Sequence, residues 1–141
     1  MDIREITPDY HVSPQISAED VAAIKEAGFV RIICNRPDAE VPPSHRASAI
    51  EAAAQAAGIE FEVLPLTHQT MTPDNVARQT EMSQASGPVL AYCASGTRCS
   101  VIWALGQAGQ HSADDILAQT AAAGYDLGNL RPMLESRITR S

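Results

Sequence analysis

Apolar residues along this chain fall into two patterns, short apolar-rich runs and stripes that recur at helical spacing. The runs cover residues 29–34, 61–66 and 88–92, and the first of them stops at the turn sequence Asn35-Arg36-Pro37-Asp38. Runs of this length predict buried strands. A candidate for an extra strand lies near residues 10–12.

Helical stripes separate these runs, and several carry capping signals. Ser17 followed by Asp20 reads as an N-cap, Gly28 ends that helix, and Thr72-Pro73 places proline at a first helical position. The predicted helices cover residues 17–28, 43–58 and 72–85, follow residue 98, begin again at Ser112, and close the chain with Leu127, Leu130, Leu134 and Ile138. Strands alternating with helices predict an α/β fold, a three-layer α/β/α arrangement of about four mainly parallel strands flanked by helices. In such sheets, sites lie beyond the carboxyl ends of the strands.

Length, charge and cysteine content narrow the class of protein. The 141 residues predict one domain, residues 1–141, and the formal net charge of −7 argues against nucleic-acid and membrane partners while leaving room for a small anionic substrate. Three cysteines without a CxxC pair, no signal peptide and no long apolar stretch favour a cytoplasmic protein with free thiols. Four scattered histidines give no ligand pattern, so neither a metal nor another cofactor is expected.

The segment after the third run carries the clearest chemical signal. It reads Cys93-Ala94-Ser95-Gly96-Thr97-Arg98 and lies between a predicted strand and a predicted helix. Inward-facing loop amides and a helix N-terminus favour an anion, so we expect a lowered pKa for Cys93 and a role as nucleophile. Gly96 supplies backbone freedom and Arg98 a planar fork for an oxyanion. The alternative is a buried structural cysteine before an ordinary helix.

The loop resembles those of two families of cysteine enzymes. Protein tyrosine and dual-specificity phosphatases carry five residues between cysteine and arginine, whereas rhodanese-type sulfurtransferases carry four, as this chain does between Cys93 and Arg98. Tyr92 stands where the phosphatases usually place histidine. A tighter loop should suit a persulfide better than a phosphoryl group, so loop length favours sulfur transfer.

A wider resemblance, to one particular family, extends over nearly the whole chain. It rests on Gln15-Ile16-Ser17, Gly28-Phe29, Asn35-Arg36-Pro37-Asp38, and Tyr92-Cys93 through Ser95-Gly96-Thr97-Arg98 with Trp103-Ala104. These segments are similar to the phosphatase-like domain of beta-lactamase-hydrolase-like proteins. The resemblance implies a protein-tyrosine/dual-specificity-phosphatase-like fold, a link to sulfide and persulfide handling, and a metallo-hydrolase partner resembling persulfide dioxygenases. Ala94 departs from the family where an arginine is often seen, and Cys99 where a serine is common.

The presence or absence of a general acid also distinguishes phosphate-ester hydrolysis from sulfur transfer. Hydrolysis of an alkyl phosphate normally needs one, and the resembling phosphatases place an aspartate after the strand that here covers residues 61–66. Residues 66–70 contain none. His68 and Asp74 are the candidates for the general acid. The alternative for Asp74 is an acidic residue that complements the dipole at a helix N-terminus, and the alternative for His68 is a solvated loop residue. Sulfur transfer needs no such acid, so the missing aspartate also favours it.

Three more side chains are candidates for the site. Cys34 ends a strand that, in the resembling topology, neighbours the one leading to Cys93, and Cys99 lies in the first helical turn after the loop. Either is a candidate resolving cysteine or sulfur acceptor; the alternatives are a buried small hydrophobe for Cys34 and a serine substitute for Cys99. Arg36 adds positive charge if its turn lies beside the loop, as the resemblance implies, or is a solvated turn residue.

The leading hypothesis is therefore a rhodanese-like sulfurtransferase that carries sulfane sulfur as a persulfide on Cys93. Thiosulfate or a low-molecular-weight persulfide would be the donor, and residues 94–98 with Cys99 would bind the anion. The alternative is a phosphatase that hydrolyses phosphate monoesters through a phosphocysteine. A non-catalytic anion-binding domain is the third hypothesis.

Overall fold

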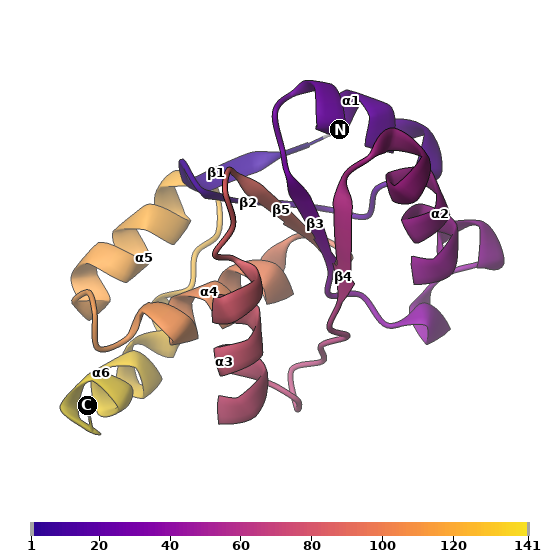
Figure 1. The fold of residues 1–141 in the computed structure, drawn as a ribbon. Helices are drawn as coiled ribbons and strands as arrows, with labels where there is room; N and C mark the ends of the chain where they lie inside the picture. The colour runs from indigo at the N-terminus through magenta and orange to yellow at the C-terminus, as the bar shows by residue number, and fades with distance from the viewer. Residues whose placement is uncertain (1, 141) are drawn as a thin grey trace.

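The computed structural model describes residues 2–140, with side chains described as far as Arg137. Its sheet has five strands in the order β1-β2-β5-β3-β4 (Figure 1). β1 pairs with β2 in antiparallel orientation, and the remaining pairs are parallel. The strands are β1 (Arg4–Thr7), β2 (Tyr10–Ser13), β3 (Arg31–Cys34), β4 (Glu60–Val63) and β5 (Val89–Tyr92).

Helices cover both faces of this sheet (Figure 1). One face carries α1 (Val21–Glu26) and α2 (Ala47–Ala57). The other carries α3 (Pro73–Met82), α4 (Thr97–Gln107), α5 (Ala113–Ala122) and α6 (Arg131–Arg140). This confirms the predicted three-layer α/β/α arrangement. Within residues 2–140, no helix has both the length and the apolar character needed to span a membrane.

Two buried clusters fill the layers, because alternate residues of a strand point to opposite faces of the sheet. In β5, Val89 and Ala91 face the layer of α3 to α6, whereas Leu90 and Tyr92 face α1 and α2. All four side chains are fully buried. Burial on both faces explains why this strand appears in the sequence as an unbroken apolar run instead of an alternation.

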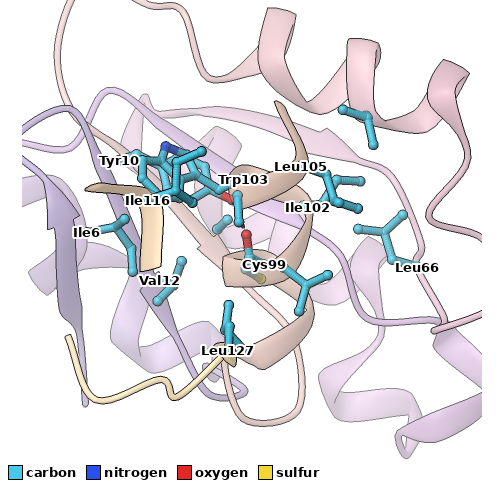
Figure 2. Packing of buried hydrophobic residues seen from close by; sticks show 14 of the residues in the cluster. Ile6, Tyr10, Val12, Leu66, Cys99, Ile102, Trp103, Leu105, Ile116 and Leu127 are labelled. Carbon is cyan, nitrogen blue, oxygen red and sulfur yellow. Dashed lines mark hydrogen bonds between the residues drawn. The ribbon is translucent and has the colours of Figure 1, made fainter. Parts of the chain in front are cut away.

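α4 is the central helix of the larger cluster (Figure 2). Its residues 99–105 are all buried, so the helix is enclosed around its whole circumference. The apolar stripe predicted for this helix therefore accounts for only part of its contacts. Cys99, Ile102 and Trp103 all belong to this cluster, and the ring of Tyr10 in β2 stacks on the Trp103 ring at a centroid distance of 6.3 Å.

The main departure from the predicted fold is β1, which raises the strand count from about four to five. Arg4 and Glu5 are exposed and only Ile6 of this strand is buried, so an edge strand of this kind leaves no apolar run to detect. Element boundaries differ as well: the second predicted helix opens as a 3₁₀ turn over Pro43–His45, and the third ends at Met82. The predicted apolar position Ile138 lies outside the described side chains.

A network of buried hydrogen bonds joins the sheet to α3 and α4. The side-chain amides of Asn35 and Gln79 exchange two hydrogen bonds of 2.9 Å each, and Gln79 also donates to the Tyr10 hydroxyl at 3.1 Å. That hydroxyl donates in turn to the Cys99 carbonyl at 2.8 Å. Buried polar groups that are all hydrogen-bonded favour a single packing arrangement. This network therefore ties β2, the end of β3 and α3 to the first turn of α4.

Candidate active site

Cys93 lies where β5 leaves the sheet, at the carboxyl edge between β2 and β3. β5 ends at Tyr92 and α4 begins at Thr97, which makes residues 93–96 a tight connection from a buried strand into a helix. Gly96 closes the turn with a φ of +93°, a conformation that side-chain-bearing residues rarely adopt. A Cβ on Gly96 would also overlap the hydroxyl of Tyr125, which lies directly against this glycine.

The environment of the Cys93 sulfur stabilises a thiolate. The side chain is fully buried, and the Gly96 N–H donates to Sγ at 3.1 Å. Hydrogen bonds from the Cys99 thiol and from the N–H groups of Cys99, Gly96 and Ser95 outweigh the cost of burial and lower the pKa of Cys93 to about 5. The thiol is therefore ionised at neutral pH, as the loop sequence predicted.

Cys99 supplies the largest single contribution to that shift. It is fully buried in the first turn of α4, and burial together with the nearby Cys93 raises its pKa well above the usual value. Cys99 therefore keeps its proton and acts as a donor to Cys93. All three cysteines of the chain are free thiols in this structure.

Replacing Cys99 with alanine is expected to raise the pKa of Cys93, because the thiolate loses its strongest donor. The rate of Cys93 alkylation by iodoacetamide rises with pH as the thiol ionises, and this rise should move to higher pH in the alanine variant. Cys99→Ser is the matched control, since a hydroxyl keeps a donor at the same place and should leave the rise near pH 5. Equal profiles for the alanine and serine variants would contradict the assigned role of Cys99.

The guanidinium of Arg98 is held in a fixed orientation. Its Nη1 and Nη2 donate to the two carboxylate oxygens of Glu40 at 2.9 and 2.7 Å, and Nη1 also donates to the Leu66 carbonyl at 2.8 Å. These bonds use three of the five guanidinium N–H groups. Within the described residues, the edge formed by Nε–H and the other Nη2–H makes no hydrogen bond. That edge is therefore available for bidentate binding of an oxyanion.

Glu40 was not anticipated from the sequence. Glu40 lies in the 3₁₀ turn Asp38–Glu40. Hydrogen bonds from Arg98, which has the larger effect, and from Arg36 hold the pKa of Glu40 below its ordinary value. The Asn35-Arg36-Pro37-Asp38 motif pointed to this turn, but nothing local marked the glutamate that meets an arginine far along the chain. Glu40 is thus the residue that, with the Leu66 carbonyl, fixes the orientation of the Arg98 guanidinium.

Arg36 lies beside the site without entering the loop. Its Nη1 donates to the side chain of Gln15 at 3.3 Å and its Nε to Glu40 at 3.3 Å. The structure therefore places Arg36 behind Glu40, where it reinforces the carboxylate that holds Arg98.

Ala94, Ser95 and Thr97 complete the loop. Ala94 and Ser95 are exposed, and the Ala94 carbonyl accepts the Gln15 N–H at 3.4 Å. The Ser95 hydroxyl donates to Thr97 Oγ1 at 2.9 Å and accepts the Thr97 N–H at 3.3 Å. Local bonds thus shape the mouth of the loop.

The remaining candidates are not brought to the sulfur. His68 and Asp74 are exposed, and no hydrogen bond or ion pair in the described structure joins either of them to residues 93–98. His68 lines a pocket of about 280 Å³ that Thr97 and Asp126 also line. Cys34 packs with Tyr92 in the α1–α2 layer, opposite the layer that receives Cys93. Among the described residues, no group of three or more His, Cys, Asp or Glu could hold a metal ion.

Sequence comparisons relate the chain to one family. A family model described as the phosphatase-like domain of beta-lactamase hydrolase-like protein matches residues 2–110. Beta-lactamase hydrolase-like proteins of Agrobacterium fabrum and Xylella fastidiosa (strain 9a5c) are 34% and 31% identical, over 82% and 100% of this chain. The alignments cover 28% and 33% of those relatives, so the chain spans about a third of their length.

Solved structures agree with this relation. A candidate phosphatase from Neisseria meningitidis is 34% identical with a TM-score of 0.85, covering 97% of this chain and 99% of its own. PTPMT1 (15% identity, TM-score 0.72) covers 98% of this chain and 97% of its own, and P. aeruginosa TpbA (16%, 0.65) covers 100% and 85%. At such identities, the last two show a shared fold alone.

The comparisons overturn the sulfurtransferase hypothesis. The matching family model and the Neisseria structure are both described as phosphatase-like, and the structural neighbours have the phosphatase fold. Loop length was a misleading guide, because a loop with four intervening residues still directs the Ser95 and Gly96 N–H groups at the Cys93 sulfur and leaves one edge of the Arg98 guanidinium unbonded. The expected persulfide donors and persulfide dioxygenase-like partner find no support in these relatives.

Proposed function

The chain belongs to the phosphatase-like domain family of beta-lactamase hydrolase-like proteins, and from that membership we propose that it hydrolyses phosphate monoesters through a phosphocysteine. The observation that carries the proposal is the buried Cys93 sulfur, whose pKa of about 5 makes it a thiolate beneath a helix N-terminus. An ionised nucleophile within a ring of N–H donors suits a substrate that is itself an anion.

In the first step, the Cys93 sulfur attacks phosphorus. The S–P bond forms while the bond between phosphorus and the ester oxygen breaks, and the departing oxygen takes a proton from solvent. The Nε/Nη2 edge of Arg98 holds the non-bridging oxygens, where negative charge is spread in the transition state, while the Gly96 N–H remains on the sulfur. Glu40 keeps that edge turned toward the substrate throughout the step.

In the second step, water attacks the phosphocysteine. The S–P bond breaks, a proton passes to solvent, and inorganic phosphate leaves with the thiolate restored. The N–H groups that lower the pKa of Cys93 also make it a good leaving group, because they stabilise the same thiolate.

The substrate class follows from the placement of His68 and Asp74. In the described structure neither makes a hydrogen bond or ion pair with residues 93–98, so we favour esters whose oxygen departs readily as an anion and depends least on a proton donor. Aryl phosphates, including phosphotyrosine, meet that condition. A variant of P. aeruginosa TpbA, 18% identical with a TM-score of 0.57, was solved in complex with phosphotyrosine.

Trapping the intermediate tests the proposal. The protein is mixed with p-nitrophenyl phosphate and quenched in acid, and its peptides are analysed by mass spectrometry. We expect a phosphate adduct on Cys93 and release of phosphate after the nitrophenol burst. Phosphate release without an adduct, or no release at all, would overturn the phosphocysteine mechanism.

A further inference from the structure

Tyr125 approaches the nucleophile loop from the turn after α5. It lies beyond the residues 2–110 matched by the family model, and its hydroxyl donates to the Ser95 carbonyl at 3.0 Å. We propose that Tyr125 is a positioning residue that fixes the Ser95–Gly96 peptide so that the Gly96 N–H points at the Cys93 sulfur. The inference deepens the proposed function, since it rests on Cys93 being the nucleophile.

The argument begins with the geometry of a single peptide unit. The Ser95 carbonyl and the Gly96 N–H belong to one planar amide and point in opposite directions. The carbonyl faces outward to the Tyr125 hydroxyl, and the N–H faces inward to Cys93 Sγ at 3.1 Å. Rotating this peptide would remove a donor from the sulfur and turn a carbonyl dipole toward the thiolate.

This peptide needs an external support. Gly96 at φ +93° has no side chain to restrict the flanking torsion angles, and Ser95 is exposed. Among the described residues, the Tyr125 hydroxyl is the donor found at the Ser95 carbonyl. The hydroxyl also fills the space that a Cβ of Gly96 would occupy, so Tyr125 lies directly against the glycine of this peptide.

The backbone of Tyr125 is itself held by the end of α5. Gly124, at φ +100°, donates its N–H to the Ala121 carbonyl, and the Tyr125 N–H donates to the Thr120 carbonyl, both at 2.9 Å. This is the Schellman pattern of a helix C-terminus. Arg4 of β1 donates to the Ala123 carbonyl at 3.1 Å and ties the same turn to the sheet. Burial raises the pKa of Tyr125, so its hydroxyl keeps the proton that it donates.

The test is Tyr125→Phe, which deletes the hydroxyl and keeps the ring. The rate of Cys93 alkylation by iodoacetamide is followed against pH, with the labelled peptide identified by mass spectrometry. We expect the fitted pKa of Cys93 to rise by about one unit, a tenfold change in its ionisation constant. The other groups whose fields interact with Cys93 are Cys99, Arg98, Tyr10 and Cys34, and none of them is altered by the substitution.

Thr80→Val is the matched control. It also removes a side-chain hydroxyl bonded to a backbone carbonyl, that of Val76 at 2.9 Å, but this contact lies within α3, and in the described structure Thr80 makes no hydrogen bond with residues 93–99. Its alkylation profile should match the wild type, with circular dichroism confirming that both variants are folded. An unchanged profile for Tyr125→Phe, or equal shifts in both variants, would overturn the proposal. Because alkylation needs no phosphate ester, the result is independent of whether the chain proves to be a phosphatase.

Discussion

Replacing Cys93 with serine is expected to abolish turnover of p-nitrophenyl phosphate, with kcat falling on the order of 10⁴-fold or more. The thiolate is stabilised by four donors and is ionised from about pH 5 upward, whereas a serine hydroxyl at the same place keeps its proton across the accessible pH range. The measurement is the initial rate of nitrophenol release at saturating substrate, with serine-variant binding followed separately by competition with inorganic phosphate.

Cys34→Ser is the matched control for that experiment. Cys34 is also a buried thiol at the end of a strand of the same sheet, but its side chain packs in the α1–α2 layer and donates to the Arg36 carbonyl at 3.4 Å. We expect this variant to keep kcat near the wild-type value. A Cys93→Ser protein that retained turnover, or a Cys34→Ser protein that lost it while folded, would contradict the assignment of the nucleophile.

The sequence predicts those elements of the fold whose burial or capping produces a recognisable pattern of neighbouring residues. Residues 88–92 are buried on both faces and therefore form a continuous apolar run, and Thr72 caps α3 by accepting the Asn75 N–H at 3.2 Å. β1 was missed because it is an exposed edge strand held by its pairing with β2. Its detection needs a partner that only the folded chain supplies.

The candidate site likewise contains residues that a local motif predicts and residues that only long-range contacts bring together. Cys93, Gly96 and Arg98 are close in sequence, and their spacing alone predicts a strand, a tight turn and a helix N-terminus. Glu40 meets Arg98 across 58 positions and Tyr125 meets Ser95 across 30, so no local motif could indicate either pair. These long-range contacts orient the groups that the motif supplies.

The error over sulfur transfer has the same origin. Loop length does not by itself measure which anion fits, because the directions of the N–H groups and of the arginine also decide what the loop binds. Residues outside the loop contribute to these directions, since Glu40 binds the Arg98 guanidinium and Tyr125 donates to the Ser95 carbonyl. A short loop with externally oriented donors can therefore serve phosphoryl chemistry.

Arg98→Lys should lower kcat for p-nitrophenyl phosphate by roughly 10²–10³-fold, the range seen when a preorganised oxyanion donor is lost. Lysine keeps the positive charge but cannot bind Glu40 and the substrate oxygens at once through two separate edges. The loss should therefore appear mainly in kcat, while KM changes less because the charge that attracts the dianion remains. Steady-state kinetics at several substrate concentrations separates the two constants.

Glu40→Gln completes the comparison, because it leaves Arg98 and its charge in place and weakens the ion pairs of Glu40 with Arg98 and Arg36. We expect kcat to fall by less than in Arg98→Lys. The pH dependence should also respond: with Glu40 neutralised, the Arg98 charge is no longer offset beside the thiolate, so the pKa of Cys93 should move downward. A Glu40→Gln protein with wild-type kcat and an unmoved acid limb would show that Arg98 holds its orientation without the carboxylate, and the Leu66 carbonyl would then be the contact that fixes it.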